Sequence, residues 1–412
     1  MNSEFVYKDI FLKVLSWIVV FGFVVLVFGK LILKDGSSFS TQTYLFLLFP
    51  SLLLFLFYGG MTNYRLLHLP VFLMLIAFLL WFSISSFWSD AGGDVVSKSF
   101  KYSVYVFLFS ISLVYFKDLD KNLTALSIFT VFIVAVLCVR EFYVSSFFQT
   151  FDFRSIRIKE FSGLGGFTHP IIFGNYLSTI SLMAFSLLLH NDRKYWPVYL
   201  LLFMLLFAGM LLTGSRGPLI SLLLTLAFSV LLYDKKIFFI ALLGLFVVAG
   251  LVVFNTSNFD AFIREPNFAE FLDSFFNGRW TTWVGAIRLL ENSPFLGFGA
   301  DADFLVFNPA TSFNAHHPHN GFLLVFYELG LIGLLLFLSL LIVTGSILYR
   351  SFFNCFSAKL GLLLLVYGVS AMLTDVHKVV SGPHIYWLII WFPVAIALYL
   401  ERTQQDILTV AK

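Results

Sequence analysis

Arginine and histidine side chains gather in the stretch from Gly278 to Gly333, which lies between long apolar segments. Arg279 stands at the start of a predicted helix, and the run His316-His317-Pro318-His319-Asn320 precedes a long apolar helix. A guanidinium offers a planar fork of donors that suits phosphate oxygens, and a neutral imidazole accepts a proton from a hydroxyl at neutral pH. The stretch therefore combines an anion-binding half with a general-base half.

The histidine run allows two interpretations, a metal site or general base chemistry. A zinc site favours ligands at helical i,i+4 spacing or cysteine partners, whereas Pro318 interrupts any helix here. Cys138 and Cys355 have no metal-ligand spacing either, so we expect neither a zinc site nor a disulfide. We predict that His319 is the base, that Asn320 could orient it, and that His317 contributes less.

Arg216 is the second candidate for binding an anion. It lies in Thr213-Gly214-Ser215-Arg216-Gly217-Pro218 between two apolar spans, where a guanidinium is costly unless it meets an anion, a carboxylate or water. Arg279 has no local carboxylate partner in the sequence, and its place at a helix N-terminus suits an anion. Snorkelling to the interface stays open for Arg216.

Four further side chains are candidates for substrate contact, each with a structural alternative. His169 opens an apolar span after a glycine-rich loop, and Arg157 belongs to a basic stripe that suits an anionic headgroup or is simply solvated. Trp283 can stack on a sugar ring or pack at the membrane interface. Arg288 can contact substrate or pair with Glu291 at i,i+3 spacing.

The elements that position these residues are membrane helices. The 412 residues are 59% hydrophobic and only 12% charged, against about 25% charged in soluble domains. Apolar runs of roughly 20 residues, enough to cross a bilayer, recur along the whole chain. We predict an all-α polytopic membrane protein, one domain over 1–412, with about twelve spans: 10–33, 43–60, 66–88, 98–116, 123–148, 168–190, 195–213, 217–233, 236–254, 320–349, 357–374 and 384–400.

The largest loop, 255–319, lies between the ninth and tenth spans and is long enough to hold short helices, one of them over Trp280–Glu291. Within it Gly297-Phe298-Gly299 predicts a tight turn, since no third glycine or βαβ context supports a nucleotide fingerprint. A cytoplasmic N-terminus places most lysines and arginines of the connections inside, as the positive-inside rule requires. Both termini are then cytoplasmic, and the loops 149–167, 213–217 and 255–319 share the outer face.

These motifs together resemble one family. Gly214-Ser215-Arg216, Gly278-Arg279-x-x-x-Trp283 with Pro294-x-x-Gly297-x-Gly299, and His319-Asn320-x-Phe322 with Glu328-x-Gly330-x-x-Gly333 are similar to the O-antigen ligase and polymerase superfamily of membrane glycosyltransferases. The match covers about residues 140–340. The run Thr168-His169-Pro170 and the histidine run are more similar to the ligase branch.

The resemblance implies a multi-pass glycosyltransferase of the bacterial inner membrane with a periplasmic active site. Such ligases move a glycan from undecaprenyl diphosphate to a sugar hydroxyl of lipid A core in lipopolysaccharide biosynthesis, without metal or cofactor. Carried onto this chain, Arg216 and Arg279 would bind the diphosphate and His319 would deprotonate the acceptor. A single displacement would invert the anomeric centre. Membrane lipid is an expected partner and nucleic acid is not.

Three other functions stay open at this point. A polymerase of the same superfamily would join repeat units on the lipid carrier, and a protein O-oligosaccharyltransferase would use a protein hydroxyl as acceptor. A transporter or lipid flippase is more distant, because the sequence shows no internal repeat and its polar cluster lies outside the predicted spans.

Overall fold

The computed structural model describes residues 3–57, 65–116, 118–145, 157–167, 169–232, 278–308, 313–374 and 376–410. The predicted ninth span, 236–254, and the first part of the large loop, 255–277, lie outside the described residues. The helix predicted inside that loop is present, within one residue of its expected bounds.

The described elements are almost entirely helical, with one short pair of strands. In chain order they are α1 (Ser3–Ile32), α2 (Gly36–Thr43), η1 (Tyr44–Leu48), α3 (Phe49–Phe57), α5 (Pro70–Ser85), η2 (Ser86–Trp88), α6 (Val95–Ile111), α7 (Leu119–Val144), α9 (Pro170–His190), η3 (Arg193–Tyr195), α10 (Trp196–Leu211), α11 (Arg216–Leu232), α15 (Arg279–Leu290), β1 (Val306–Asn308), β2 (Phe313–Ala315), α16 (Gly321–Ser351), α17 (Phe356–Met372), η4 (Ile385–Leu388) and α18 (Trp391–Val410).

Helix length and composition confirm the predicted class, an all-α polytopic membrane protein. Within the described ranges, eight helices are long and apolar enough to cross a membrane, and α11 and α17 are shorter apolar helices. The second predicted span is irregular, because a π-helical turn joins α2 to α3. Prolines open α5, α9 and α10 in the first turn, where a missing amide proton costs no hydrogen bond.

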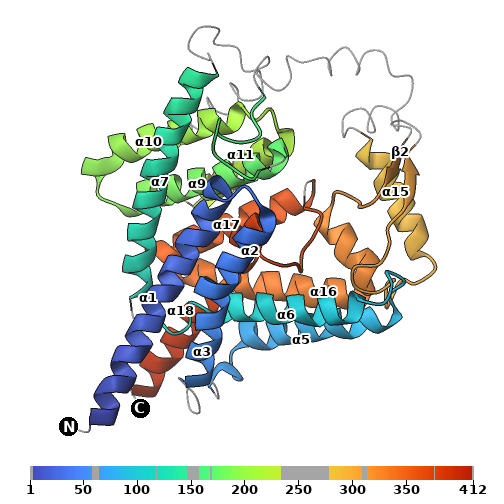
Figure 1. The fold of residues 1–412 in the computed structure, drawn as a ribbon, viewed down its shortest axis with the longest axis horizontal. Coiled ribbons are helices and arrows are strands. Elements are labelled where there is room, and N and C mark those ends of the chain that lie inside the picture. The colour runs from blue at the N-terminus through green and yellow to red at the C-terminus, as the bar shows by residue number, and fades with distance from the viewer. Residues whose placement is uncertain are drawn as a thin grey trace.

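The helix ends fall into two groups at opposite ends of the bundle. At one end, where Figure 1 shows both termini at the lower left, Arg402 of α18 donates to Val114 O, just after α6, and Asp120 of α7 accepts from the first amides of α17. At the other end, Gly166 donates to Lys30 at the end of α1, and Ile158 donates to Leu212 between α10 and α11. The segment 157–167 is thereby fastened across this second end.

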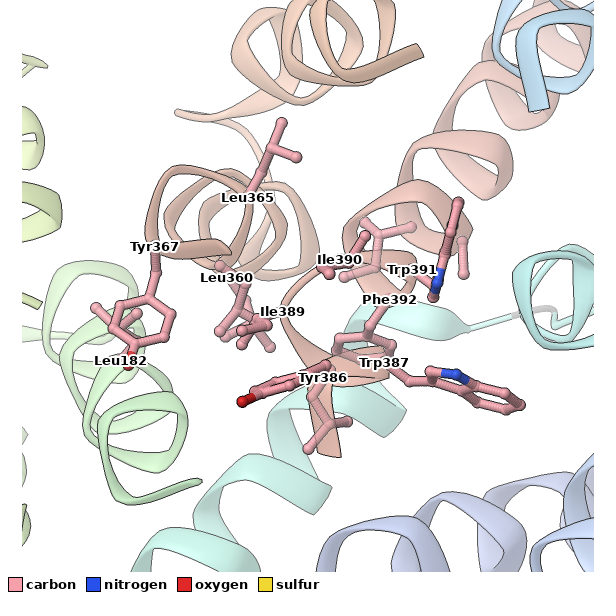
Figure 2. Close-up of a cluster of buried hydrophobic side chains, with 14 of the residues drawn as sticks. Leu182, Leu360, Leu365, Tyr367, Tyr386, Trp387, Ile389, Ile390, Trp391 and Phe392 are labelled. Atoms are coloured by element: carbon pink, nitrogen blue, oxygen red, sulfur yellow. The ribbon is translucent and has the colours of Figure 1, made fainter. Parts of the chain in front are cut away.

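The core is packed around α17 and α18. Figure 2 shows side chains of η4 and the start of α18 on the side of α17 that carries Leu360, while Leu365 points away from them and the Tyr367 ring extends toward Leu182 of α9. The Tyr367 hydroxyl donates to Asn175 Oδ1 at 2.7 Å, and so α17 is joined to the first turns of α9. Helix α17 also packs on both α11, which begins with Arg216, and α16, which follows His319. It therefore connects the two helices that carry these candidate residues.

Helix α16 is interrupted at Gly330, where φ is 64° and ψ is −170°, a combination that side chains rarely allow. The segment Pro294–Gly299 inserts into the break and satisfies the freed backbone groups. Its bonds are Phe298 N to Tyr327 O (2.9 Å), Gly299 N to Glu328 O (2.8 Å), Leu331 N to Pro294 O (2.9 Å) and Ile332 N to Phe295 O (3.3 Å). The Trp81 indole donates to Leu329 O at 3.0 Å.

The insertion of Pro294–Gly299 into the break of α16 explains why this segment contains glycines. Gly297 and Gly299 have φ of 70° and 98°, as the predicted turn requires. A Cβ on Gly297 would lie 2.4 Å from the Gly330 nitrogen, and so the two backbones approach too closely for any side chain. The motif glycines therefore join the loop to the broken helix.

The inserted loop carries α15 and the strand pair on a small core of its own. Ala286, Ala302, Phe304 and Tyr327 are buried together, and the Phe298 ring stacks on Tyr327 with centroids 4.7 Å apart. Figure 1 shows α15 and β2 beside one end of α16. Because Tyr327 belongs to α16, this small core fixes α15 relative to the start of that helix.

Candidate functional site

The histidine run forms the turn that leads into α16. Asn320 is the N-cap, and its Oδ1 accepts from the amides of Phe322 and Leu323 at 3.0 Å each. This oxygen is engaged in capping, which differs from the expected role of orienting His319. The cap fixes the place where the helix begins and hence the place of the histidine before it.

His317 and His319 lie in contact on one side of this turn. Their ring centroids are 3.9 Å apart, and Pro318 between them is buried. His319 has a φ of 51°, in the left-handed region that non-glycine residues seldom adopt. The Trp283 indole donates to Pro318 O at 2.8 Å and ties the turn to α15. Trp283 thus supports the histidines through its polar edge.

Arg279 reaches the histidines from the first turn of α15. Gly278, with φ of 79°, forms the N-cap of this helix. Burial first, and then electrostatic interaction with His317, Arg279, His377 and His169, lowers the pKa of His319 to about 3. The pKa of His317 falls to about 4, first through burial and then through His377 and Arg279. The structure therefore brings the predicted arginine and histidine halves together.

His169 faces the same centre from another direction. It caps α9 through Nδ1, which accepts from the Ile171 amide at 3.3 Å, and it is among the charges that act on His319. Because Nδ1 accepts, the proton of the neutral ring is on Nε2. His169 is exposed, so its Nε2–H is accessible to a ligand.

Arg216 and Arg157 lie together on the α9–α11 side. Arg216 is the first residue of α11, after Gly214 with φ of 60°. A Cβ on Gly214 would be 3.6 Å from Arg157 Cγ, which places the Arg157 side chain across this turn. Gly174 of α9 packs on the same turn through Thr213 and Pro218, and so Arg216 shares the end of the bundle that holds His169.

Arg288 is the predicted residue that the structure does not bring into the cluster. It lies in the last turn of α15 and is exposed. Nine residues along a helix separate it from Arg279 by about 14 Å, beyond direct contact with the same phosphate.

Sequence reasoning missed three residues of the segment between α17 and η4. The His377 ring lies 5.3 Å from that of His317, and His384 lies 6.1 Å from His377. Lys378 and Lys98 both pair with Asp301, the first at 2.9 Å. Although burial raises the pKa of Asp301, the hydrogen bonds from Lys98 and Lys378 outweigh it and hold the pKa below its usual range. The sequence did contain a signal for these residues, because His377, Lys378 and His384 interrupt the otherwise apolar last third of the chain.

Comparison with known proteins agrees with this geometry. The sequence model of the O-antigen ligase family matches residues 200–338, which include Arg216, Arg279 and His319. An O-antigen ligase of Pseudomonas aeruginosa is 24% identical over 396 residues, covering 95% of this chain and 93% of that protein. Both findings confirm the resemblance read from the motifs. Residues 200–338, and at lower identity nearly the whole chain, are thus similar to O-antigen ligases, a similarity that implies an enzyme of glycosyl transfer, and the described helices are those of a multi-pass membrane protein.

Proposed function

We propose that this protein transfers a glycan from undecaprenyl diphosphate to a sugar hydroxyl of lipid A core in lipopolysaccharide biosynthesis. The observation that carries the proposal is the convergence of Arg279, His317 and His319, within a chain similar to O-antigen ligases. An anion binder beside a neutral imidazole suits a phosphate-bearing donor and a hydroxyl acceptor.

Arg279 and Arg216 hold the donor diphosphate in this proposal. As the glycosidic C–O bond breaks, its electron pair goes to the diphosphate oxygen, whose negative charge grows. Fixed guanidinium groups stabilise that charge more in the transition state than in the bound donor, which is the condition for rate enhancement. Arg157, across the turn from Arg216, extends the basic surface toward a lipid phosphate.

His319 accepts the proton of the acceptor hydroxyl while the hydroxyl oxygen attacks the anomeric carbon. The lowered pKa keeps the ring neutral, and hence able to accept, across the physiological range. Attack opposite the leaving diphosphate inverts the anomeric centre. The step balances without metal, nucleotide or redox partner, so the proposed reaction needs no cofactor.

The remaining candidates have supporting roles in this proposal. His169 presents Nε2–H to the substrate, His317 backs His319, Trp283 and Asn320 hold the turn, and Arg288 is left for a distal part of the glycan or for solvent. Stacking of Trp283 on a sugar stays compatible with its half-buried ring.

The proposed location is the bacterial inner membrane, with the site periplasmic and both termini cytoplasmic. The end of the bundle opposite the site carries Lys121, Lys359 and Arg402, on the elements whose ends meet there. Positive charge favours the cytoplasmic side, which supports this orientation.

Deletion of the gene tests the function in cells. We expect lipopolysaccharide to lose its O-antigen ladder while lipid-linked glycan accumulates. Core capped by a single repeat unit would instead indicate a polymerase, and loss of glycan from a protein would indicate a protein acceptor. A normal ladder would remove the proposal. Solute movement by purified protein in liposomes, without any change of a glycan, would favour a transporter.

Substitutions test the residues. His319→Ala and Arg279→Ala should each abolish transfer by purified protein, and Arg279→Lys should be poor because lysine lacks the bidentate fork. His190→Ala, at the opposite end of the bundle, is the matched control and should be active. Wild-type activity in either site variant would exclude that residue from the mechanism.

A further inference from the structure

A line of imidazole rings continues from His319 away from the α15 side of the site. The ring centroids are 3.9 Å apart from His319 to His317, 5.3 Å from His317 to His377 and 6.1 Å from His377 to His384. The first two rings belong to the turn before α16, and the other two belong to the segment between α17 and η4. His317 and His377 are 60 positions apart in the sequence, so folding alone brings the two pairs together.

The far end of the line is fixed in one tautomer. His384 caps η4, and its Nδ1 accepts from the Tyr386 amide at 3.3 Å, which leaves the proton of the neutral ring on Nε2. The Tyr386 ring packs against both neighbours, with centroids 4.5 Å from His384 and 5.5 Å from His377. Protonation of His384 at Nδ1 would break the cap, so an extra proton is not stored on this ring.

His317 occupies the middle of the line with an unused nitrogen. Its Nδ1 is buried and has no hydrogen-bond partner among the residues that the structure describes. Leaving a buried polar atom unsatisfied costs about 1–3 kcal/mol, so it is rarely kept without a reason. An imidazole with one nitrogen open and imidazoles on both sides can take a proton at one nitrogen and release another from the second.

The groups around His317 disfavour a proton that stays bound to its ring. His377, Arg279, His316 and Lys378 act on His317, and each of them is positive or becomes positive on protonation. The nearby carboxylate, Asp301, is held by Lys98 and Lys378. A proton delivered to His319 therefore has no counter-ion in the line and moves on. His377 is half-buried and precedes the exposed Lys378, which gives the line an outlet to solvent.

We propose that His317 and His377 form a proton relay that returns His319 to its neutral form after each transfer. This inference rests on the proposed function of His319 as the base. The acceptor proton bound to one nitrogen of His319 passes to His317, His317 releases its other proton to His377, and His377 releases one to water. Each ring gains and loses one proton, so the sequence balances. His317 and His377 are positioning residues, since neither needs to touch the sugar.

The test compares His377→Gln with wild type and with the control His190→Gln, using full-length protein in liposomes with lipid-linked donor and acceptor. Loss of the relay should lower kcat by about tenfold, less than the roughly 10²–10⁴-fold expected for loss of the base itself. KM for both substrates should be unchanged. The rate of His377→Gln should rise with added imidazole, because a small base then removes the proton that the relay carried.

His317→Gln should give the same imidazole dependence, and the double variant should be no slower than the singles, since the residues act as a unit. Wild-type kcat in His377→Gln, or a loss that raises KM and that imidazole does not restore, overturns the relay. If His319→Ala is inactive and His377→Gln is normal, only the relay fails. If His319→Ala is active, the proposed base itself is wrong.

Discussion

Replacing Gly330 with alanine tests whether the break in α16 holds the site together. The alanine Cβ would lie 2.1 Å from the Phe295 carbonyl oxygen, well inside contact distance. Because the backbone at this residue also has φ of 64° and ψ of −170°, the side chain cannot be accommodated by a rotamer change. The inserted segment Pro294–Gly299 must move.

The magnitude follows from two contributions. Forcing a non-glycine residue into this backbone region costs of order 1–3 kcal/mol. Displacing the segment also leaves the Leu331 and Ile332 amides without Pro294 O and Phe295 O, at about 1–3 kcal/mol for each unsatisfied group. We therefore expect Gly330→Ala to lower the free energy of unfolding by at least about 3 kcal/mol. Transfer should also fall, because the segment carries α15 and Arg279.

The same helix provides a matched control. Gly345 has ordinary helical geometry, and its added Cβ would meet only Leu365 Cδ2 at 3.4 Å. Gly345→Ala should be neutral or stabilising by up to about 1 kcal/mol. Both variants are to be unfolded by denaturant in one detergent, with tryptophan fluorescence as the signal. Equal stability of the two variants, with normal transfer, would refute the role of the break.

Three further predictions concern the site. Burial first, and then the positive groups around it, lower the pKa of His319 to about 3, so its neutral form persists as the pH falls. The acid limb of kcat/KM, which reports the free enzyme, should therefore lie below pH 5. The acid limb of kcat should lie at a higher pH, because a donor phosphate charge about 6 Å from His319 raises its pKa by about 2 units at an effective dielectric of 20. A kcat/KM limb near pH 6.5 would contradict this. Trp283→Phe keeps an aromatic ring but removes the indole N–H that holds the turn before α16. The kcat of Trp283→Phe should fall roughly fivefold, whereas Trp280→Phe should have the wild-type kcat. Equal kcat in the two variants would contradict a role for the hydrogen bond from Trp283 to Pro318 O. Asn320→Ala should lose about 1 kcal/mol of unfolding free energy and Asn320→Asp much less, because aspartate also caps. Inactive but equally stable variants would indicate a direct contact with substrate instead.

Local signals were enough to predict the ends of the helices that carry the site. A proline after His169, a glycine before Arg279 and Asn320 before an apolar run each mark a helix start, and each start lies within two residues of the predicted one. Candidate side chains here lie at helix N-termini, and Arg216, predicted one residue before a span, is the first residue of α11.

Long-range pairing could not be predicted from the same signals. Gly330 and Gly345 look alike within one apolar run, yet only the first is a break, because only it meets the loop 294–299. His377 and His384 were missed for a related reason. Nothing local in the chain relates them to His317, and the contact depends on how the segment after α17 folds back over the start of α16.

The break at Gly330 also determines how far the site stands from the bilayer. Helix α16 has 31 residues, about 46 Å of helix, whereas the hydrocarbon core is about 30 Å thick. The part after the break, 331–351, is about 31 Å long and can cross the membrane by itself. The part before it, 321–329, adds about 13 Å of helix on the side of the break that follows His319. In the proposed function, with 331–351 in the membrane, this length would hold the proposed base beyond the lipid tail of the carrier and level with its sugars. The proposed acceptor lipid, anchored in the same leaflet, would then bring its outermost hydroxyl to the base while both lipids stay in the membrane.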